Sequence, residues 1–340
     1  MTDEERAKAA TIFDVARLAG VSHQTVSRVL NDLPNVRPAT RERVQRAIAQ
    51  LRYIPSPAAR ALVTRRSRTI GLITTGLPEF GPSTTAVYLN EAAREERYAV
   101  IMASLLTADF ASLRQAAEVL VRQNVEAIVL ITSNRSTLGL LEGMEIGVPF
   151  VAVASQGSGL HRISFDQYAG ARRAVRHLIE LGHTEIRHLA GPADSMDAIE
   201  RGRGGREALG EHGLVAQEPL MGNWAASSGY RNAQQLLAEG RPFTAIFAGN
   251  DQMALGAVRA VVEAGLRVPE DVSVIGFDDV PEAEHFTPPL TTMRQDFAQL
   301  GRDAMTLVLA VLRDEDAGQL LPRVPNLVVR RSTGPAPASR

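Results

Sequence analysis

Residues 11–31 read TIFDVARLAGVSHQTVSRVLN, and this stretch predicts two short helices joined by a tight turn. Thr11 suits the N-cap of the first helix, and Asp14 three residues later completes a capping-box pattern. Gly20 can take the left-handed conformation that the turn requires, and Ser22 then caps the second helix. The pattern is typical of a helix-turn-helix.

The second predicted helix buries Val26 and Val29 and leaves a run of hydrogen-bonding side chains outward. An α-helix fits the major groove of B-DNA, and its first residues then lie nearest to the base edges. We predict base contacts from His23, Gln24 and Arg28, because Gln pairs with adenine and Arg with guanine. The short side chains predicted to bind phosphates are Ser22, Thr25, Ser27, Asn31 and Thr40. A solvated polar face is the alternative, but the cap, the turn glycine and the basic segment that follows together favour DNA.

The net charge of −1 conceals an uneven distribution of charge along the chain. Residues 11–68 hold eleven Arg against three Asp or Glu residues, whereas residues 69–340 carry an excess of acidic side chains. A basic module releases counterions when it binds a polyanion, so these arginines indicate a nucleic-acid partner. The acidic remainder is not expected to bind DNA indiscriminately.

The length of 340 residues suggests two or three domains, and 45% hydrophobic residues can fill more than one core. No uninterrupted apolar run approaches the ~18 residues of a membrane span, and the charged start lacks an apolar signal region. The absence of cysteine excludes disulfides, thiol nucleophiles and thiolate metal sites. We therefore expect a cytoplasmic protein with no membrane partner.

The rest of the N-terminal region is predicted to complete a small module and a linker. We expect a disordered arm over residues 1–10 and a helix-turn-helix headpiece over residues 11–55, in which Thr40 caps a third helix. The apolar stripe of that helix consists of Val44, Ala47, Ile48 and Leu51. Residues 56–68 are interpreted as a basic linker that contains a short helix beginning at Pro57.

From residue 69 onward, short apolar runs alternate with amphipathic helical stretches. The predicted strands are 70–73, 99–102, 127–131, 150–153, 186–189, 245–248 and 272–277. The predicted helices are 86–97, 111–123, 170–181, 229–238 and 252–264. This alternation predicts an α/β core of doubly wound parallel sheets, long enough for two subdomains. Ligands bind such folds at the carboxyl ends of the strands, here in the cleft between the subdomains.

Three predicted strand ends deliver polar side chains to one rim, because Arg201, Asn250 and Asp278 each follow a different strand. A fixed donor, an amide and a carboxylate suit a polyhydroxyl ligand, since each hydroxyl both donates and accepts hydrogen bonds. Trp224, the single tryptophan, offers a ring face to an apolar sugar surface. Each residue also has a structural interpretation: Asn250 and Asp278 as caps or turn formers, Arg201 as a surface side chain, and Trp224 as a core residue.

The chain resembles the lactose and galactose repressor family of bacterial transcription regulators. The residues that carry the resemblance are 12–16, 19–22 and 25–31, followed by Tyr53-Ile54-Pro55 and Ala59-Arg60-Ala61-Leu62. The resemblance extends through almost the whole chain, and it implies a homodimer whose headpieces bind a near-palindromic operator. It also implies that residues 56–68 hold a hinge helix, which pairs across the dimer and bends the DNA with Ala59 and Leu62 in the minor groove.

By the same resemblance, residues 69–340 form a ligand-binding and dimerisation core like that of a sugar-binding periplasmic protein. Subdomain one would take residues 69–166 plus 297–325, and subdomain two residues 167–296 plus 326–340. The implied effector-binding residues are Asp197, Arg201, Trp224, Asn250, Asp278, Gln295 and Phe297, with Ser83 in a further matching segment.

Two departures from the family pattern leave the identity of the ligand open. After the predicted strand 150–153, where relatives present an aspartate to the sugar, this chain has Ala154-Ser155. Acidic Glu79 precedes the segment Gly81-Pro82-Ser83 that resembles its counterpart in the family. A disaccharide or glycoside is favoured by the resemblance.

We therefore predict a transcriptional repressor that releases its operator when a small sugar binds between the core subdomains. The alternative is a regulator that binds DNA more tightly with a small-molecule or protein corepressor. A sugar-transport component would need a signal peptide and no headpiece. The tail at 328–335 lacks the apolar heptads of a tetramerising coil, so a dimer is expected.

No enzyme, resident metal or cofactor is expected. The seven histidines show no metal-ligand spacing, and no Gly-x-Ser-x-Gly elbow is present. The run Gly202-Arg203-Gly204-Gly205 lies inside a helical pattern and lacks the lysine and hydroxyl of a phosphate loop.

Overall fold

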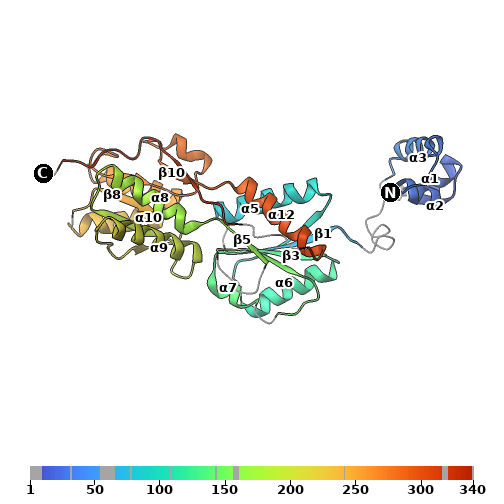
Figure 1. Ribbon diagram of the computed structural model, residues 1–340, viewed down its shortest axis with the longest axis horizontal. Helices are drawn as coiled ribbons and strands as arrows, with labels where there is room; N and C mark the ends of the chain where they lie inside the picture. Colours follow the sequence, from blue (N-terminus) through green and yellow to red (C-terminus); the bar gives the residue numbers. More distant parts are fainter. Residues whose placement is uncertain are drawn as a thin grey trace, which may run out of the picture. The chain divides into compact units, whose positions relative to one another are not determined.

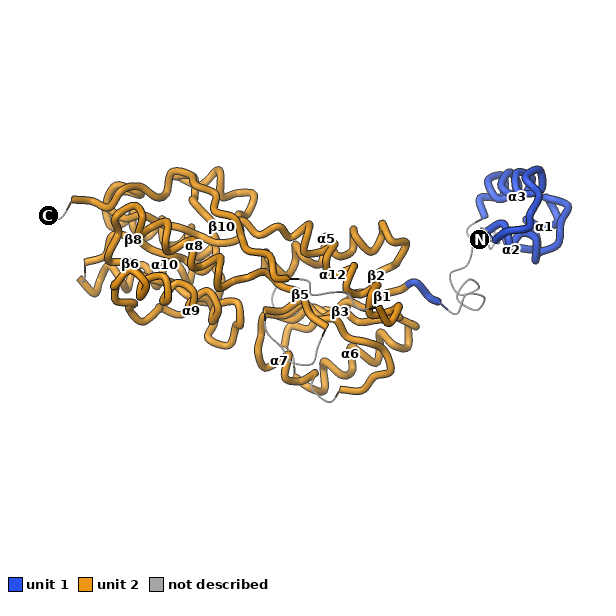
Figure 2. The backbone as a smooth tube through the Cα atoms, viewed as in Figure 1, with its two compact units in different colours: residues 1–68 blue, residues 69–340 orange. Residues whose placement is uncertain are grey.

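The computed structural model describes residues 10–30, 33–53, 66–76, 79–107, 109–141, 144–155, 161–240, 242–315 and 321–338. The chain divides into two compact units, residues 1–68 and residues 69–340 (Figure 2). Several predictions lie outside the described residues: the arm before Ala10, the phosphate contact Asn31, and the hinge helix with Ala59 and Leu62.

Unit 1 contains helices α1 (Ile12–Ala19), α2 (His23–Leu30) and α3 (Pro38–Leu51). At the start of α1, the Thr11 amide donates to the Asp14 carboxylate (2.9 Å) and the Asp14 amide donates to the Thr11 hydroxyl (3.4 Å). Gly20 ends α1 in the left-handed conformation at φ 64°. The Thr25 amide then donates to the Ser22 hydroxyl (3.2 Å), which caps α2. These contacts confirm the predicted helix-turn-helix.

The start of α3 differs from its prediction. The helix begins at Pro38, with Arg37 at the N-cap, so the prediction that Thr40 caps it was wrong. Proline fits the first helical position because an N–H there makes no hydrogen bond within the helix, so its absence costs nothing, and because the φ of proline is already helical. The three helices within the described part of unit 1 share one small core, whose buried residues are Val15, Ala16, Ala19, Val26, Val29, Val44 and Ala47.

The first half of unit 2 is built on a five-stranded parallel sheet with the order β2-β1-β3-β4-β5. The strands are β1 (Thr69–Thr75), β2 (Ala99–Leu105), β3 (Ala127–Ile131), β4 (Phe150–Val153) and β5 (His161–Ile163). Helices cover both faces of this sheet (Figure 1). One face packs on α5 (Phe80–Glu95) and α12 (Phe297–Leu312), and the other on α6 (Phe110–Arg122) and α7 (Arg135–Gly139).

The second half repeats this plan on a four-stranded parallel sheet with the order β7-β6-β8-β9. Its strands are β6 (Ile186–Ala190), β7 (Leu220–Met221), β8 (Ala245–Ala248) and β9 (Ser273–Ile275). One face packs on α8 (Gln167–Glu180) and α9 (Met196–Glu211), and the other on α10 (Ala226–Ala238) and α11 (Asp251–Glu263). A short 3-10 helix, η1 (Pro281–His285), follows β9. The α/β prediction of doubly wound parallel sheets is confirmed.

The chain passes between the two halves three times. It crosses after β5 into α8, again between β10 (Thr292–Arg294) and α12, and finally after α12 to β11 (Asn326–Val328). β10 and β11 pair antiparallel, so two of the crossings lie side by side. A core that is crossed three times must hinge about all three segments together.

The two halves also meet through the loops that follow β3 and β6. The Met196 amide donates to the Ser133 carbonyl (2.7 Å), and the Arg135 amide donates to the Asp194 carbonyl (3.1 Å). Asn134 and Ser195 form an isolated antiparallel β-bridge between them. Main-chain groups therefore join the halves at this edge.

Helix starts and very short strands account for the main differences from the sequence prediction. Helices α5, α8, α10 and α11 begin one to six residues earlier than expected. At α8 the Asp166 carboxylate accepts from the Ala169 amide (2.8 Å), so the helix begins at Gln167 rather than near Gly170. Strands β5, β7, β10 and β11 were missed, because two or three residues carry too little periodicity to be recognised.

Candidate functional site

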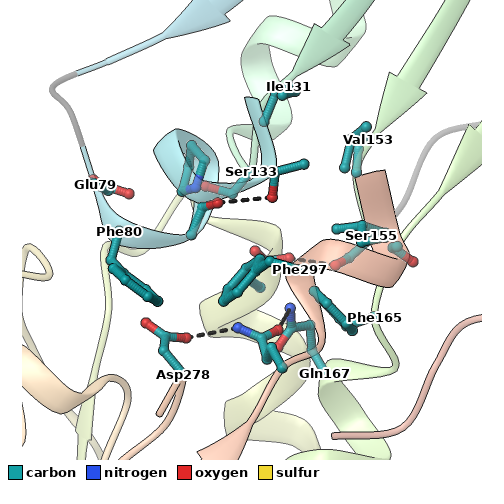
Figure 3. A pocket seen from close by; sticks show the side chains of 18 of the residues that line it. Glu79, Phe80, Ile131, Ser133, Val153, Ser155, Phe165, Gln167, Asp278 and Phe297 are labelled. Carbon is teal, nitrogen blue, oxygen red and sulfur yellow. Dashed lines mark hydrogen bonds between the residues drawn. The ribbon is translucent and has the colours of Figure 1, made fainter. Parts of the chain in front are cut away.

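A cavity lies where the carboxyl ends of strands from both sheets of unit 2 face each other (Figure 3). Seven residues implied by the family resemblance line it together: Asp197, Arg201, Trp224, Asn250, Asp278, Gln295 and Phe297. They come from α9, from the loops after β7, β8 and β9, and from the crossing into α12. Ser83 does not line this cavity but a separate groove beside α5 and β2.

Arg201 is the best-anchored side chain of the cavity. It projects from the second turn of α9 and is 4% exposed. Its Nε donates to Gln167 Oε1 (2.8 Å), and another guanidinium nitrogen donates to the carbonyl of Gly249. The guanidinium carbon lies over the Phe277 ring, 3.8 Å from its centroid, in a cation–π contact. Arg201 is therefore a buried, oriented donor and not a surface side chain.

The carboxylate partner of Arg201 is Asp278, whose Oδ1 lies 3.5 Å from the guanidinium. Two amide side chains close a ring with this pair. Gln295 Nε2 donates to Asp278 Oδ1 (2.7 Å), and Gln167 Nε2 donates to Gln295 Oε1 (3.0 Å). Every member of this ring is buried, so each is fixed before any ligand arrives. Gln167 was not predicted, because it lies at a crossing that the sequence did not mark as the start of a helix.

The backbone of Asp278 is held in an uncommon conformation, with φ 112°. Its amide donates to the carbonyl of Met293 (2.8 Å), in a bridge that continues β10. Such conformations cluster where surrounding contacts impose a functional geometry. Burial raises the pKa of Asp278 to about 6, although Arg201 opposes the rise. This carboxyl is thus a buried acid poised near neutrality.

Asn250 and Trp224 have the structural roles considered from the sequence, and both also line the cavity. Asn250 Oδ1 accepts from the Met253 amide (2.9 Å) and so caps α11, while its Nδ2 donates to the Trp224 carbonyl (3.0 Å). Trp224 is 9% exposed and packs on the backbone at two strand ends. A Cβ added at Gly191 would lie 2.2 Å from its ring, and one at Gly249 3.1 Å, so both glycines leave room for the indole.

The opposite wall of the cavity comes from the first half of unit 2. Ser155, which follows β4, donates its hydroxyl to the carboxylate of Asp197 across the cavity. Phe297 packs edge to face on Phe80 and on Phe165, with ring centroids 5.5 and 5.4 Å apart. Sequence reasoning missed Phe80 and Phe165, since neither lies in a motif.

Glu79 adds an unexpected acid to this wall (Figure 3). Its carboxylate has no hydrogen bond or ion pair with any residue that the structure describes. Burial and the negative charges of Asp278 and Asp197 together raise the pKa of Glu79 to about 7, although Arg201 opposes the rise. A second carboxyl of the cavity is therefore poised near neutrality.

The predicted DNA-reading residues lie on the surface of α2 or beside it. His23, Gln24 and Arg28 are exposed, and Thr25 and Ser27 are half-buried. The His23 ring lies 5.2 Å from that of exposed Phe13, so α1 supports the first residue of α2. Ser22 and Thr25 share a 3.0 Å hydrogen bond between their hydroxyls. Thr40 lies in the first turn of α3 and is half-buried.

Within the described ranges, no group of three or more His, Cys, Asp or Glu side chains has an arrangement that could hold a metal ion. No helix in the same ranges is both long enough and apolar enough to span a membrane.

Two family models match separate parts of the chain. Residues 11–56 match the bacterial regulatory proteins of the lacI family, and residues 175–333 match a periplasmic binding protein-like domain. The fold and the cavity thus define a regulator with a helix-turn-helix module and a core of the periplasmic binding protein type.

Two relatives match this chain over nearly its whole length. It is 36% identical to the lactose operon repressor of Escherichia coli (strain K12), over 96% of this chain and 91% of that one. It is 34% identical to the repressor PurR of Vibrio atlanticus (strain LGP32), over 95% and 98% of the two chains. The chain belongs to the lacI family of bacterial regulatory proteins and is a DNA-binding transcriptional repressor rather than an enzyme.

Solved structures show the same likeness over the whole chain. A lac repressor dimer bound to operator and the anti-inducer ONPF matches with a TM-score of 0.86 at 34% identity, covering 96% of this chain and 100% of that one. The regulator CelR in complex with cellobiose matches with a TM-score of 0.71 at 32% identity, covering 95% and 99%.

Proposed function

We propose that this repressor binds a near-palindromic operator as a homodimer and releases it when a small sugar enters the cavity. The observation that carries the proposal is the preformed ring of Arg201, Gln167, Gln295 and Asp278 beside aromatic faces. Fixed donors and acceptors recognise hydroxyls, while Trp224 and Phe297 suit the apolar faces of a sugar. The relatives named for lactose and cellobiose support the same ligand class.

The position of the cavity explains how a ligand acts on DNA binding. A ligand shifts a conformational equilibrium only by its difference in affinity between the two states. Gln167 and Gln295 lie on two of the three crossings, and Asp197 and Ser155 face each other from opposite halves. A sugar that changes these contacts changes the angle between the halves, and operator and sugar then oppose each other reciprocally.

The homodimer is proposed on an apolar groove of the first half. Val87 on α5, and Met102 and Leu106 at β2, are 64%, 60% and 72% exposed. β2 is an edge strand, and these side chains line one groove with Ala86 and Val100. Exposed apolar patches of this kind mark protein interfaces, and the lac repressor matched above is a dimer. A second copy of the chain fits this groove.

A corepressor mechanism is the second candidate, favoured by the likeness to PurR. The aromatic side chains Phe80, Phe297 and Trp224 would also accommodate a planar heterocycle. In that case the ligand would strengthen operator binding instead of weakening it. The sign of the effect distinguishes the two mechanisms.

One titration tests both candidates. An operator is first selected from random DNA by the full-length chain, and its affinity is then measured by fluorescence anisotropy with sugars or purines added. Weakening by a sugar is the expected result. Strengthening by a purine would establish the corepressor mechanism, and equal affinity for operator and random DNA at physiological salt would contradict sequence-specific repression.

A further inference from the structure

The cavity holds more negative than positive charge. Among its described lining residues, three are acidic, namely Glu79, Asp197 and Asp278, and one is basic, Arg201. A neutral sugar requires hydrogen-bonding groups but no net charge around it. The excess of carboxylates is therefore a property of the site that a neutral polyhydroxyl ligand leaves unexplained.

Contacts within the cavity show which charges are already compensated. Arg201 lies 3.5 Å from Asp278 and donates its other hydrogen bonds to Gln167 and to the Gly249 carbonyl. The single cation is thus matched to one acid. Asp197, in the first turn of α9, accepts a hydrogen bond from the neutral Ser155 hydroxyl, and no described Arg, Lys or His forms an ion pair with it, so no cation compensates its charge.

Glu79 is the second uncompensated acid, and it enters from the opposite half of unit 2, ahead of α5. Its carboxylate has no partner among the described residues, yet it is half-buried on the cavity wall. Burying a carboxylate beside two others is costly unless a cation joins them or a carboxyl takes up a proton. Metal coordination is not the explanation, since the described residues contain no group arranged to hold a metal ion.

Aromatic rings complete a surface that attracts cations. Phe80 is adjacent to Glu79 in sequence, and its ring lies 5.5 Å from that of Phe297 in the same cavity. The faces of such rings carry negative potential and bind ammonium groups, more strongly where water is excluded. Figure 3 shows Glu79, Phe80 and Asp278 on one side of the view and Ser155 on the other.

We propose that the effector carries a protonated amine, and that Glu79 and Asp197 hold this ammonium while the ring around Arg201 holds the hydroxyls. The effector class is therefore an amino sugar with a free amine, such as a hexosamine or a disaccharide that contains one. This inference rests on the proposed function, because it assumes that a sugar occupies the cavity.

The test compares matched sugars by isothermal titration calorimetry on the full-length dimer at pH 7. Glucosamine, galactosamine, mannosamine and the glucosamine disaccharide are each paired with the neutral sugar and with the N-acetylated sugar. N-acetylation removes the charge and keeps the nitrogen. We expect at least one free amine to bind about tenfold or more tightly than both of its partners, which corresponds to about 1.4 kcal/mol.

A pair of variants assigns the effect to Glu79. Glu79→Gln keeps the size of the side chain and should reduce the preference for the amine about tenfold. Glu95→Gln changes an exposed acid at the end of α5, the helix that Glu79 precedes, and should leave the preference unchanged. Glu79 faces Asp278, Asp197 and Arg201, so binding of an ammonium lowers its pKa and expels a proton. Below pH 7, calorimetry in two buffers should therefore detect proton release with the amine. Glu79→Gln should release fewer protons, because Asp278, with a pKa of about 6, is then the remaining carboxyl that titrates in this range.

The outcomes separate this inference from the proposed function. If a neutral or N-acetylated sugar binds more tightly than every free amine, the ammonium proposal is overturned while sugar-controlled repression stands. If no sugar of either kind binds and a purine does, both are overturned. An amine preference that survives Glu79→Gln unchanged would remove Glu79 from the ammonium site and overturn its assignment.

Discussion

Replacing Arg201 with methionine removes the cation of the ring but keeps a side chain of similar length. The guanidinium now donates to Gln167 (2.8 Å) and to the Gly249 carbonyl, and it lies 3.5 Å from Asp278. Both members of the ion pair are buried, at 5% and 8% side-chain exposure. Arg201→Met therefore leaves Asp278 as an unpaired acid inside the core.

The expected loss follows from this burial. Removing one partner of a buried ion pair destabilises a protein by about 3–5 kcal/mol, because the remaining charge is uncompensated. The pKa of Asp278 is already about 6 in the presence of Arg201, and it rises further when that cation is removed. A folded-state pKa above the unfolded value means that the folded state binds the proton more tightly, so stability falls as pH rises. This fall lies between about pH 4 and 6 in the native chain, and in the variant it continues above pH 6.

The assay is urea unfolding followed by the fluorescence of Trp224, which lies in the cavity. Arg201→Met should lose about 3–5 kcal/mol at pH 8 and less at pH 5, where Asp278 is protonated. Adding Asp278→Asn should recover part of the loss at pH 8. As a control, Arg203→Met on the same helix removes the ion pair between exposed Arg203 and half-buried Glu200 and should cost about 1 kcal/mol or less.

Two results would refute the reasoning. An equal loss at pH 5 and pH 8 would show that Asp278 is not the group left unpaired, and a double variant no more stable than Arg201→Met would show the same. In function, Arg201→Met should retain operator binding and lose the response to every sugar. A full response to sugar would mean that Arg201 does not contact the effector.

Three further predictions concern other parts of the molecule. Gly191→Ala places a Cβ 2.2 Å from the Trp224 ring, so the indole should move. Its fluorescence emission should shift, and the free energy of unfolding should fall by about 1–3 kcal/mol. An unchanged emission spectrum would contradict this packing. Arg28→Ala should weaken operator binding by about 1–3 kcal/mol in anisotropy titrations, and a similar loss on random DNA would indicate a phosphate contact instead. Met102→Asp should convert the dimer to monomers in sedimentation experiments and weaken operator binding. Val215→Asp, at another exposed apolar site, should do neither.

The features predicted correctly from the sequence are those with local physical signals. Thr11, Asp14 and Gly20 each perform in the structure the role that capping and turn chemistry assigned to them. One rule predicted that Arg201, Asn250 and Asp278 lie close together: the carboxyl ends of parallel strands share an edge of the sheet. The structure places all three on one cavity.

The features that were missed depend on contacts between distant segments. Gln167 joins the ring only because two crossings lie side by side, and its partner Gln295 is 128 residues away in sequence. Phe80 and Phe165 are brought to the cavity by packing around Phe297, which no periodicity encodes. Asn250 shows that two interpretations of one residue can both be compatible with the structure. It caps α11 and also lines the cavity.

The β-bridge between Asn134 and Ser195 bears on how regulators of this kind diversify. Its neighbouring hydrogen bonds, from Met196 to Ser133 and from Arg135 to Asp194, use amides and carbonyls that every amino acid except proline supplies. Mutation can therefore change the side chains of the cavity walls while these main-chain contacts between the halves remain. A few substitutions can therefore change the ligand specificity, while the connection between the two halves is kept.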